Sequence, residues 1–256
     1  MGSTLRGAFG YALKKTVCIN PTFKCEGCFS LNSCLFYDFY EKQNDIHPFR
    51  FDIELGSSGY DFSYFLFEDA CEKLPYILSS FHQMFTKIGI GKDRETIDDI
   101  SIYVNDILSF NGDEFTIPDD YIKIKQDNIE SKSIVLKFST PLRMKKQKRF
   151  IRDHKDLTLI DILLSIDKRA HQLKAKPYER TQFDTNFKVV NTNLKFKDLT
   201  RFSNTQKTKM QLGGMMGEMV ISNLDEQNLK LLKLGELIGV GKQTVFGLGK
   251  IEVIEI

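Results

Sequence analysis

The sequence predicts an α+β protein with two tandem ferredoxin-like domains, which we place at residues 1–118 and 119–256. Apolar residues alternate in several short segments and recur at helical spacing in others. In the second half these segments follow the order strand, helix, strand, strand, helix, strand, which defines the ferredoxin-like fold. The first half follows the same order without its first strand. The net charge also changes sign between the halves.

The first half opens with a helix, expected at residues 3–17. The alternating segments FRFDIEL and DFSYFLF predict strands at 49–55 and 60–67. Apolar residues at helical spacing predict a second helix at 71–88, and a strand is expected near 100–104. No strand precedes the first helix, so the first domain is expected to lack its N-terminal strand and to leave a sheet edge open.

The second half contains all six elements of the fold. The segment SIVLKFSTPLR predicts a strand, and LTLIDILLSIDKRAHQL predicts a helix. Two strands are expected close together before the second helix, and the chain closes with a last strand. The expected bounds are 133–143 for the first strand, 157–173 for the first helix, 207–221 for the strand pair, 226–238 for the second helix and 249–256 for the last strand.

The charge is distributed unevenly along the chain. The whole protein carries a net charge of +2. Residues 1–118 contain 10 basic and 17 acidic residues, a net charge of −7, whereas residues 119–256 contain 26 and 17, a net charge of +9. Lysine and arginine that neutralise phosphates dominate the affinity for nucleic acids, so a polyanion is expected to bind mainly the second half. A basic surface without any ligand is the alternative.

Neither a membrane span nor a secretion signal is recognisable in the sequence. No apolar run approaches the ~18 residues that a transmembrane helix needs. Arg6 and Gly7 lie where a signal peptide requires an apolar stretch. We therefore expect a cytoplasmic protein with no membrane partner.

A glycine-rich segment, GVGKQTVFGLGK at residues 239–250, precedes the last expected strand. It is not a nucleotide-binding P-loop, because Gly235 and Gly241 are six residues apart and Gln243 follows Lys242. It is not a dinucleotide fingerprint either, because that motif opens a helix and this segment follows one. Glycines let a backbone approach phosphates, and lysines supply charge. A helix cap followed by a tight turn is the alternative.

Five segments of the chain carry a family resemblance. They are GSTLRGAFGYALKK, CEGCFSLNSCLFY, FSTPLRMKK, TRFSNTQKTKMQLGGMMGE and GVGKQTVFGLGKIEV, which together span almost the whole sequence. In this order they resemble the CRISPR-associated RAMP-superfamily endoribonucleases, which process precursor CRISPR RNA. The resemblance implies two ferredoxin-like domains that bind CRISPR repeat RNA, and a strand before the segment matched by Gly2 to Arg6.

The resemblance also implies a metal-independent cleavage that needs no cofactor. The ribose 2′-OH attacks the adjacent phosphate and leaves a 2′,3′-cyclic phosphate and a 5′-OH. The family places its catalytic residues at the end of the first helix or in the following loop, which points to His47 as the base, with Tyr37 and Lys42 beside it. The alternative is that His47 is an ordinary exposed loop residue. His154, which follows the basic run, is a separate candidate for contact with RNA.

A basic run after the first strand of the second half supports RNA binding, since it places six cations in ten residues. A solvated charged surface is the alternative. The two-domain arrangement brings this run together with other cations and with the glycine-rich segment. The candidate RNA-binding residues are Arg143, Lys145, Lys146, Lys148, Arg149, Arg201, Lys207, Lys209, Gly239, Gly241, Lys242, Gly247, Gly249 and Lys250.

Four cysteines form a separate candidate site. Cys18, Cys25, Cys28 and Cys34 fall within seventeen positions. In a cytoplasmic protein such a cluster favours a metal over disulfides, and zinc bound tetrahedrally by four thiolates is the expected occupant. This zinc would be structural, because four protein ligands leave no open position for a substrate. Reduced thiols packed in the core are the alternative.

Two other functions are alternatives to the cleaving enzyme. The first is a non-cleaving RNA-binding subunit of a CRISPR effector complex, with other effector proteins as partners. The second is a zinc-dependent module whose basic half contacts another protein. A homodimer is included among the expected partners.

Overall fold

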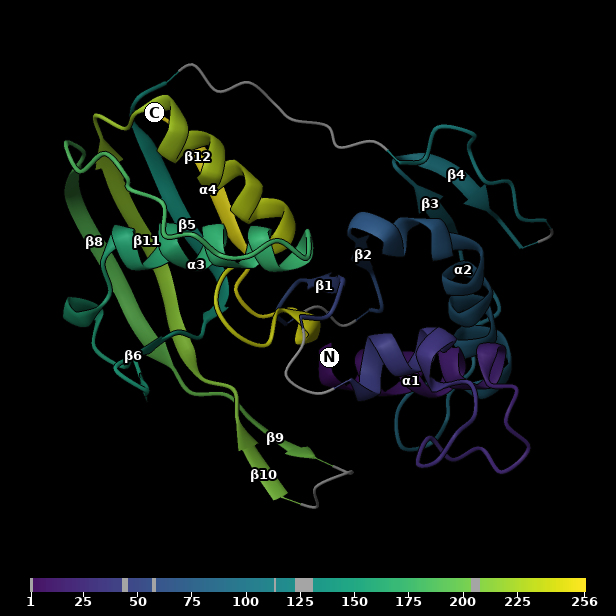
Figure 1. Cartoon of the computed structure of the whole chain (residues 1–256). Helices are drawn as coiled ribbons and strands as arrows, with labels where there is room; N and C mark the ends of the chain where they lie inside the picture. The colour runs from purple at the N-terminus through teal and green to yellow at the C-terminus, as the bar shows by residue number, and fades with distance from the viewer. Residues whose placement is uncertain (1, 43–45, 57–58, 113, 123–130, 204–207) are drawn as a thin grey trace. The chain divides into compact units, whose positions relative to one another are not determined.

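The protein is described by a computed structural model in which helices and antiparallel strands form two compact units (Figure 1). The first unit contains Met1–Phe49 and Leu66–Lys125, and the second contains Arg50–Phe65 and Gln126–Ile256. This confirms the α+β class. The described residues are 2–42, 46–56, 59–112, 114–122, 131–203 and 208–256, with side chains left out at 201–210.

The second unit is built on an antiparallel sheet with the strand order β12–β5–β11–β8. Helix α3 connects β5 to β8, and α4 connects β11 to β12, so the predicted ferredoxin-like order is confirmed. The elements are β5 (Ile134–Leu142), α3 (Leu159–Leu173), β8 (Lys188–Lys197), β11 (Gly214–Ser222), α4 (Glu226–Ile238) and β12 (Ile251–Glu255).

Local sequence signals explain both helices of this unit. Thr158 and Asp161 form a capping box at the start of α3, and the Asp225 carboxylate accepts from the Asn228 N–H at the start of α4. A side chain at Gly235 would come within 2.6 Å of Ile166 in α3, so this glycine lets the two helices pack closely. Ile134, Leu136, Phe138 and Leu142 of β5 are buried, which places the core between helices and sheet.

One strand of this sheet was predicted at the wrong place. Of the two strands expected at 207–221, only β11 belongs to the sheet, and the other sheet strand is β8, which the sequence did not indicate. The segment before β11 forms a hairpin of β9 (Thr200–Ser203) and β10 (Thr208–Gln211). Strand β8 lies at the sheet edge and most of its residues are exposed, so it carries no strong apolar alternation.

The first unit contains two helices that pack together, α1 (Gly2–Val17) and α2 (Leu74–Gln83). The helix predicted at 71–88 is divided, because a 3₁₀ segment (Glu68–Lys73) precedes α2 and a π-helical segment (Met84–Ile88) follows it. Strands β3 (Ile102–Val104) and β4 (Ile107–Phe110) form a hairpin. Across the residues that the structure describes, no helix has both the length and the apolar character of a membrane span.

Strands β1 (Phe49–Ile53) and β2 (Phe62–Leu66) pair with each other between α1 and α2 in the chain. Most of this hairpin groups with the second unit, although it lies in the first half of the sequence. The compact units therefore do not follow a single cut in the sequence. The division into domains at 1–118 and 119–256 stays a prediction.

Tyr40 fixes a π-helical segment, η2 (Tyr37–Glu41), against α1. Its hydroxyl donates to the Arg6 carbonyl at 2.8 Å, and its ring stacks on Phe36 and Phe49 at centroid distances of 5.4 and 5.8 Å. Gly10 makes room for this ring, because a Cβ there would lie 2.5 Å from Cε1 of Tyr40. Burial raises the pKa of the Tyr40 hydroxyl well above its ordinary range, against a smaller lowering by Arg6.

Replacing Tyr40 with phenylalanine tests this packing. The Tyr40→Phe variant should lower the free energy of unfolding at pH 8 by about 1 kcal/mol, because the Arg6 carbonyl loses its donor. The raised pKa means that the unfolded chain releases this proton first, so the stability due to Tyr40 is lost as pH rises above about 10. The difference between variant and wild type should therefore shrink above that pH in urea unfolding followed by circular dichroism.

The control for this experiment is Tyr76→Phe, because the Tyr76 side chain is 53% exposed. This variant should match the wild type at every pH. A constant difference between Tyr40→Phe and the wild type across the alkaline range would contradict the role assigned to burial of the hydroxyl.

Candidate nucleic-acid interface

The glycine-rich loop, residues 239–250, begins where two buried arginines meet the end of α4. Nη1 of Arg50 donates to the Glu236 carbonyl at 3.2 Å, and Nε of Arg169 donates to the Ile238 carbonyl at 2.7 Å. The two residues are 1% and 9% exposed. Cationic donors at this end satisfy carbonyls that have no partner within the helix and match the helix dipole. The arginines thereby fix the point from which the loop starts.

These arginines leave an excess of positive charge beneath the loop. Nη2 of Arg50 bonds Oδ2 of Asp52 at 2.5 Å, and Nζ of Lys250 bonds Oδ1 of the same carboxylate at 2.8 Å. Arg169 forms no ion pair within the described part of the chain. Burial, followed by the nearby Arg50, lowers the pKa of Arg169 to about 10. The local field therefore favours an anion at the loop.

Sequence analysis did not select either arginine. Arg50 lies in the alternating segment FRFDIEL, where its position beside two phenylalanines predicts an exposed side chain on a strand. Arg169 lies on α3 among other polar residues. The local pattern around Arg50 does not indicate burial, because its side chain contacts Phe65 and the end of α4. Arg169 follows Ile162 and Ile166 at helical spacing, so its place on the buried face of α3 could have been recognised.

The loop folds onto the second unit through its own backbone. The N–H groups of Val240, Gly241 and Lys242 donate to the Gly249 carbonyl, the Ser165 hydroxyl and the Arg143 carbonyl at 2.9, 3.1 and 2.8 Å. These donors are therefore used inside the protein. A phosphate contact by this part of the loop is left to the Lys242 side chain, which is exposed.

Packing within the protein also accounts for three of the loop glycines. A Cβ at Gly249 would overlap the Val240 carbonyl oxygen. A Cβ at Gly241 would lie 2.6 Å from the Arg143 carbonyl oxygen, and one at Gly247 would lie 2.5 Å from Ile53. All three glycines have positive φ angles, between 71° and 79°. Their contribution to RNA binding stays a prediction, because substituting them would first disturb the loop itself.

A basic hairpin lies next to this loop. It consists of β6 (Lys145–Lys146) and β7 (Arg149–Phe150), joined directly to the end of β5. Arg143 connects hairpin and loop, because its guanidinium lies 3.7 Å from the Phe150 ring centroid while its carbonyl accepts from the Lys242 N–H. Its Nη1 also donates to the Gly213 carbonyl at 3.0 Å. Burial and then the nearby Arg152 lower the pKa of Arg143.

The predicted RNA-binding cations differ in their availability. Lys146 pairs with Asp161 at 2.9 Å, and Lys250 pairs with Asp52 as described above. Lys207 lies outside the described residues, and only the backbone is described at Arg201 and Lys209, in β9 and β10. Four predicted cations are exposed and have no acidic partner among the residues that the structure covers. These are Lys145, Lys148, Arg149 and Lys242.

The catalytic candidates Tyr37, Lys42 and His47 all lie in the first unit. Tyr37 begins η2, and the Lys42 N–H that ends it donates to the Tyr37 carbonyl at 2.9 Å. The His47 ring is half-buried and lies 5.9 Å from the Phe49 ring. Residues 43–45, between Lys42 and His47, lie outside the described part. The catalytic roles of the three candidates stay predictions.

The predicted four-cysteine zinc site does not form. No group of three or more potential metal ligands occurs among the described residues, which include Cys18, Cys25, Cys28 and Cys34. The Cys28 N–H donates to the Cys25 carbonyl at 3.1 Å, so this pair forms a backbone turn. All four thiols are free and half-exposed. Short spacing along the chain thus fails to bring the thiols together, and we assign no metal here.

Comparison with known proteins shows what each half of this chain is similar to. Residues 136–251, which include β8, β11, most of β5, the basic hairpin and the glycine-rich loop, match the family model of the CRISPR-associated endoribonuclease Cas6. This part of the chain is similar to the CRISPR-associated Cas6 endoribonucleases. Residues 1–114 match a second family model, described as an N-terminal domain. The predicted resemblance to RAMP-superfamily endoribonucleases is therefore confirmed.

Two solved structures share the fold of this chain, and one further protein is similar in sequence. A Cas6 product complex (TTHB231) has 14% sequence identity and a TM-score of 0.53, covering 99% of this chain and 93% of that one. A second Cas6 product complex (TTHA0078) has 14% identity and a TM-score of 0.50, with coverages of 98% and 92%. An uncharacterized protein of Archaeoglobus fulgidus is 25% identical over 97% of this chain and 90% of its own length.

Alanine at Gly249 tests the packing of the glycine-rich loop. Gly249→Ala should destabilise the protein by at least about 3 kcal/mol, because the methyl group adds an overlap with the Val240 carbonyl to the strain of a positive φ angle. The control is Gly56→Ala, since Gly56 belongs to the same unit, also has a positive φ angle and has open space around it. This control should cost about 1 kcal/mol. Equal losses in urea unfolding would contradict the close packing of the loop.

Proposed function

We propose that this protein is a sequence-specific endoribonuclease of the Cas6/RAMP type that cleaves CRISPR repeat RNA in the cytoplasm during the maturation of CRISPR RNA. The match of residues 136–251 to the Cas6 endoribonuclease family carries this proposal. The exposed cations of the basic hairpin and Lys242 support it, because they lie in the part of the chain that matches the family. Effector proteins and a second copy of this chain remain predicted partners.

The proposed reaction needs no metal ion. The 2′ oxygen of one ribose forms a bond to the adjacent phosphorus while the bond from phosphorus to the 5′ oxygen breaks. A base accepts the proton of the 2′-OH, and an acid donates a proton to the departing 5′ oxygen. The products are a 2′,3′-cyclic phosphate and a 5′-OH. The chain contributes the proton transfers and the positive groups around the charged phosphorane.

His47 is the proposed base, since an imidazole is suited to proton transfer near neutral pH. Tyr37 and Lys42 are the proposed groups that orient the sugar or stabilise the phosphorane, and they lie close to His47 in the sequence. Tyr40, which is also nearby, is unsuited to this role because its hydroxyl is bonded to the Arg6 carbonyl and its pKa is raised.

The cations of the second unit are proposed to hold the RNA backbone. Lys145, Lys148 and Arg149 lie on the exposed basic hairpin, and Lys242 lies on the loop attached to it through Arg143. Contacts of this kind set the position of the RNA without reading its sequence. The excess positive charge at Arg50 and Arg169 adds to the attraction from beneath the loop.

Cleavage in EDTA tests the proposed function directly. The purified protein should cut the end-labelled repeat RNA of its host at one position and leave a cyclic phosphate. A copy with a 2′-deoxy nucleotide at that position should remain intact, because the nucleophile is absent. Tight binding without cleavage would replace the enzyme with the non-cleaving RNA-binding subunit, and the absence of binding would overturn both.

Substitution of His47 tests the proposed base. His47→Ala should lower the single-turnover cleavage rate at least about 100-fold and change the Kd for repeat RNA by no more than about twofold. His82→Ala serves as the control, because the His82 ring packs edge-on against Phe110 and Phe115 in the first unit. Normal cleavage by His47→Ala would remove His47 from the mechanism.

The salt dependence of binding separates phosphate contacts from internal ion pairs. Lys242→Ala should weaken binding and reduce the slope of log K against log salt concentration by about 1, because one fewer phosphate is neutralised. Lys250→Ala should reduce this slope less, because the Lys250 ammonium group is bound to the Asp52 carboxylate. A smaller change for Lys242→Ala than for Lys250→Ala would contradict this interface.

A further inference from the structure

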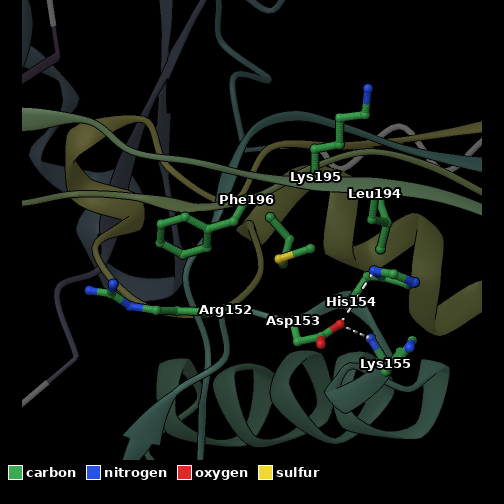
Figure 2. Close-up of a pocket in the computed structure, with 8 residues that line it drawn as sticks. Arg152, Asp153, His154, Lys155, Leu194, Lys195 and Phe196 are labelled. Carbon is green, nitrogen blue, oxygen red and sulfur yellow. Dashed lines mark hydrogen bonds and ion pairs between the residues drawn. The ribbon is translucent and has the colours of Figure 1, made fainter.

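A hollow of about 510 Å³ opens on the second unit beside the basic hairpin (Figure 2). One side is formed by the segment 152–155, which follows β7 and leads to α3. The other side is formed by Leu194 and Phe196 of β8 and by Met215 of β11. Of these residues, the sequence had pointed to nucleic-acid contact only for Arg152, the last cation of the basic run, and for His154.

The floor of this hollow is apolar. Leu194 and Met215 are 6% and 1% exposed, and Phe196 stands beside them with a half-buried ring. Gly213 supports that ring from behind, because a Cβ at Gly213 would lie 2.9 Å from it. Lys195 also lines the hollow, and Figure 2 shows its side chain extending away from the other labelled side chains. The floor thus offers a flat aromatic surface with an aliphatic border.

Arg152 and the Phe196 ring meet at one end of the hollow. The Arg152 guanidinium lies 5.4 Å from the Phe196 ring centroid, whereas the Arg143 guanidinium lies only 3.7 Å from Phe150. Arg152 is held at this distance by Gln211, whose Oε1 accepts from Nη2 at 3.2 Å. Arg152 thus makes a cation–π contact with Phe196 that is longer than the contact between Arg143 and Phe150.

The rim of the hollow carries positive charge. Arg152 and Lys155 are exposed, and the acidic residue between them, Asp153, is engaged by its neighbours. Its Oδ1 accepts from the Lys155 N–H at 3.0 Å and lies 3.4 Å from Nδ1 of His154. A phosphate at this rim would face the Arg152 guanidinium, because the Asp153 carboxylate is directed toward His154 and the Lys155 backbone (Figure 2).

We propose that this hollow binds one unpaired nucleotide of the RNA, with its base on Phe196 and its phosphate at Arg152. This site rests on the proposed function, since it selects a nucleotide of the same RNA. Aromatic rings and guanidinium planes are the surfaces on which unpaired bases stack. Only Ile151 separates β7 from Arg152, so a strand whose phosphates follow the basic hairpin reaches the hollow next.

Abasic substitution of the RNA tests this site. A series of host repeat RNAs, each with one abasic ribonucleotide in a single-stranded position, is titrated with the full-length protein. With wild type, one position should raise the Kd about 10-fold, because its base no longer stacks. With Phe196→Ala, intact RNA should bind about 10-fold more weakly, and the abasic substitution at that position should have no further effect.

Two further variants separate stacking from folding. Phe196→Tyr keeps the aromatic face and should restore both the affinity and the sensitivity to the abasic position. Arg152→Ala should weaken binding and reduce the salt slope by about 1, since it removes a phosphate contact. The control is Phe29→Ala, because Phe29 is 77% exposed and lies in the first unit. It should leave the binding of every RNA unchanged.

The outcomes of this experiment distinguish the site from the proposed function. If wild type does not bind intact repeat RNA, the proposed function fails. If it binds the RNA but every abasic position is equivalent, the function stands and the nucleotide site is wrong. The site is also wrong if Phe196→Ala keeps the same sensitivity to the abasic position as wild type.

Discussion

The second unit depends on two guanidinium groups that donate hydrogen bonds to the carbonyls at the end of a helix, where water would otherwise bind. Arg50 and Arg169 donate to the last-turn carbonyls of α4, and the chain then turns directly into the glycine-rich loop. A buried cation is costly, so its hydrogen bonds must offset the loss of hydration. These bonds set where the loop begins, while the adjacent backbone bonds from residues 240–242 set its course. The same charges that support the fold also favour an anionic partner.

Helix and strand order were predictable because burial leaves a periodic signal. Helix α4 has the predicted bounds, 226–238, and the predicted first helix differs from α1 by one residue at its start. Strand β8 escaped prediction because an exposed edge strand needs no apolar alternation. Tyr40 and Arg50 escaped for a different reason. Their burial arises from partners that lie 34 and 186 residues away, and no local pattern records such contacts.

The candidate site shows the same division between local and long-range information. The basic run and Lys242 were identified from composition, and composition suffices for a surface that attracts phosphates. Composition did not show that Lys146 and Lys250 are held by aspartates, because Asp52 lies far from Lys250 in the sequence. The glycines were interpreted as a means of approaching phosphate, whereas Gly249 is required by the Val240 carbonyl in the same loop. The same residue type in the sequence, a lysine or a glycine, can therefore serve either the binding of phosphate or the packing of the protein itself.

The hairpin of β1 and β2 limits how the chain can be divided into fragments that fold separately. Its residues 50–65 belong to the second unit while the chain on both sides belongs to the first, so the polypeptide passes between the units three times. A fragment that begins at residue 119 would lack Arg50, and the Glu236 carbonyl would lose its donor. It would also lack Ile53, which fills the space beside Gly247. The part of the chain that matches Cas6 is therefore completed by residues outside that match, and no single cut yields both units intact.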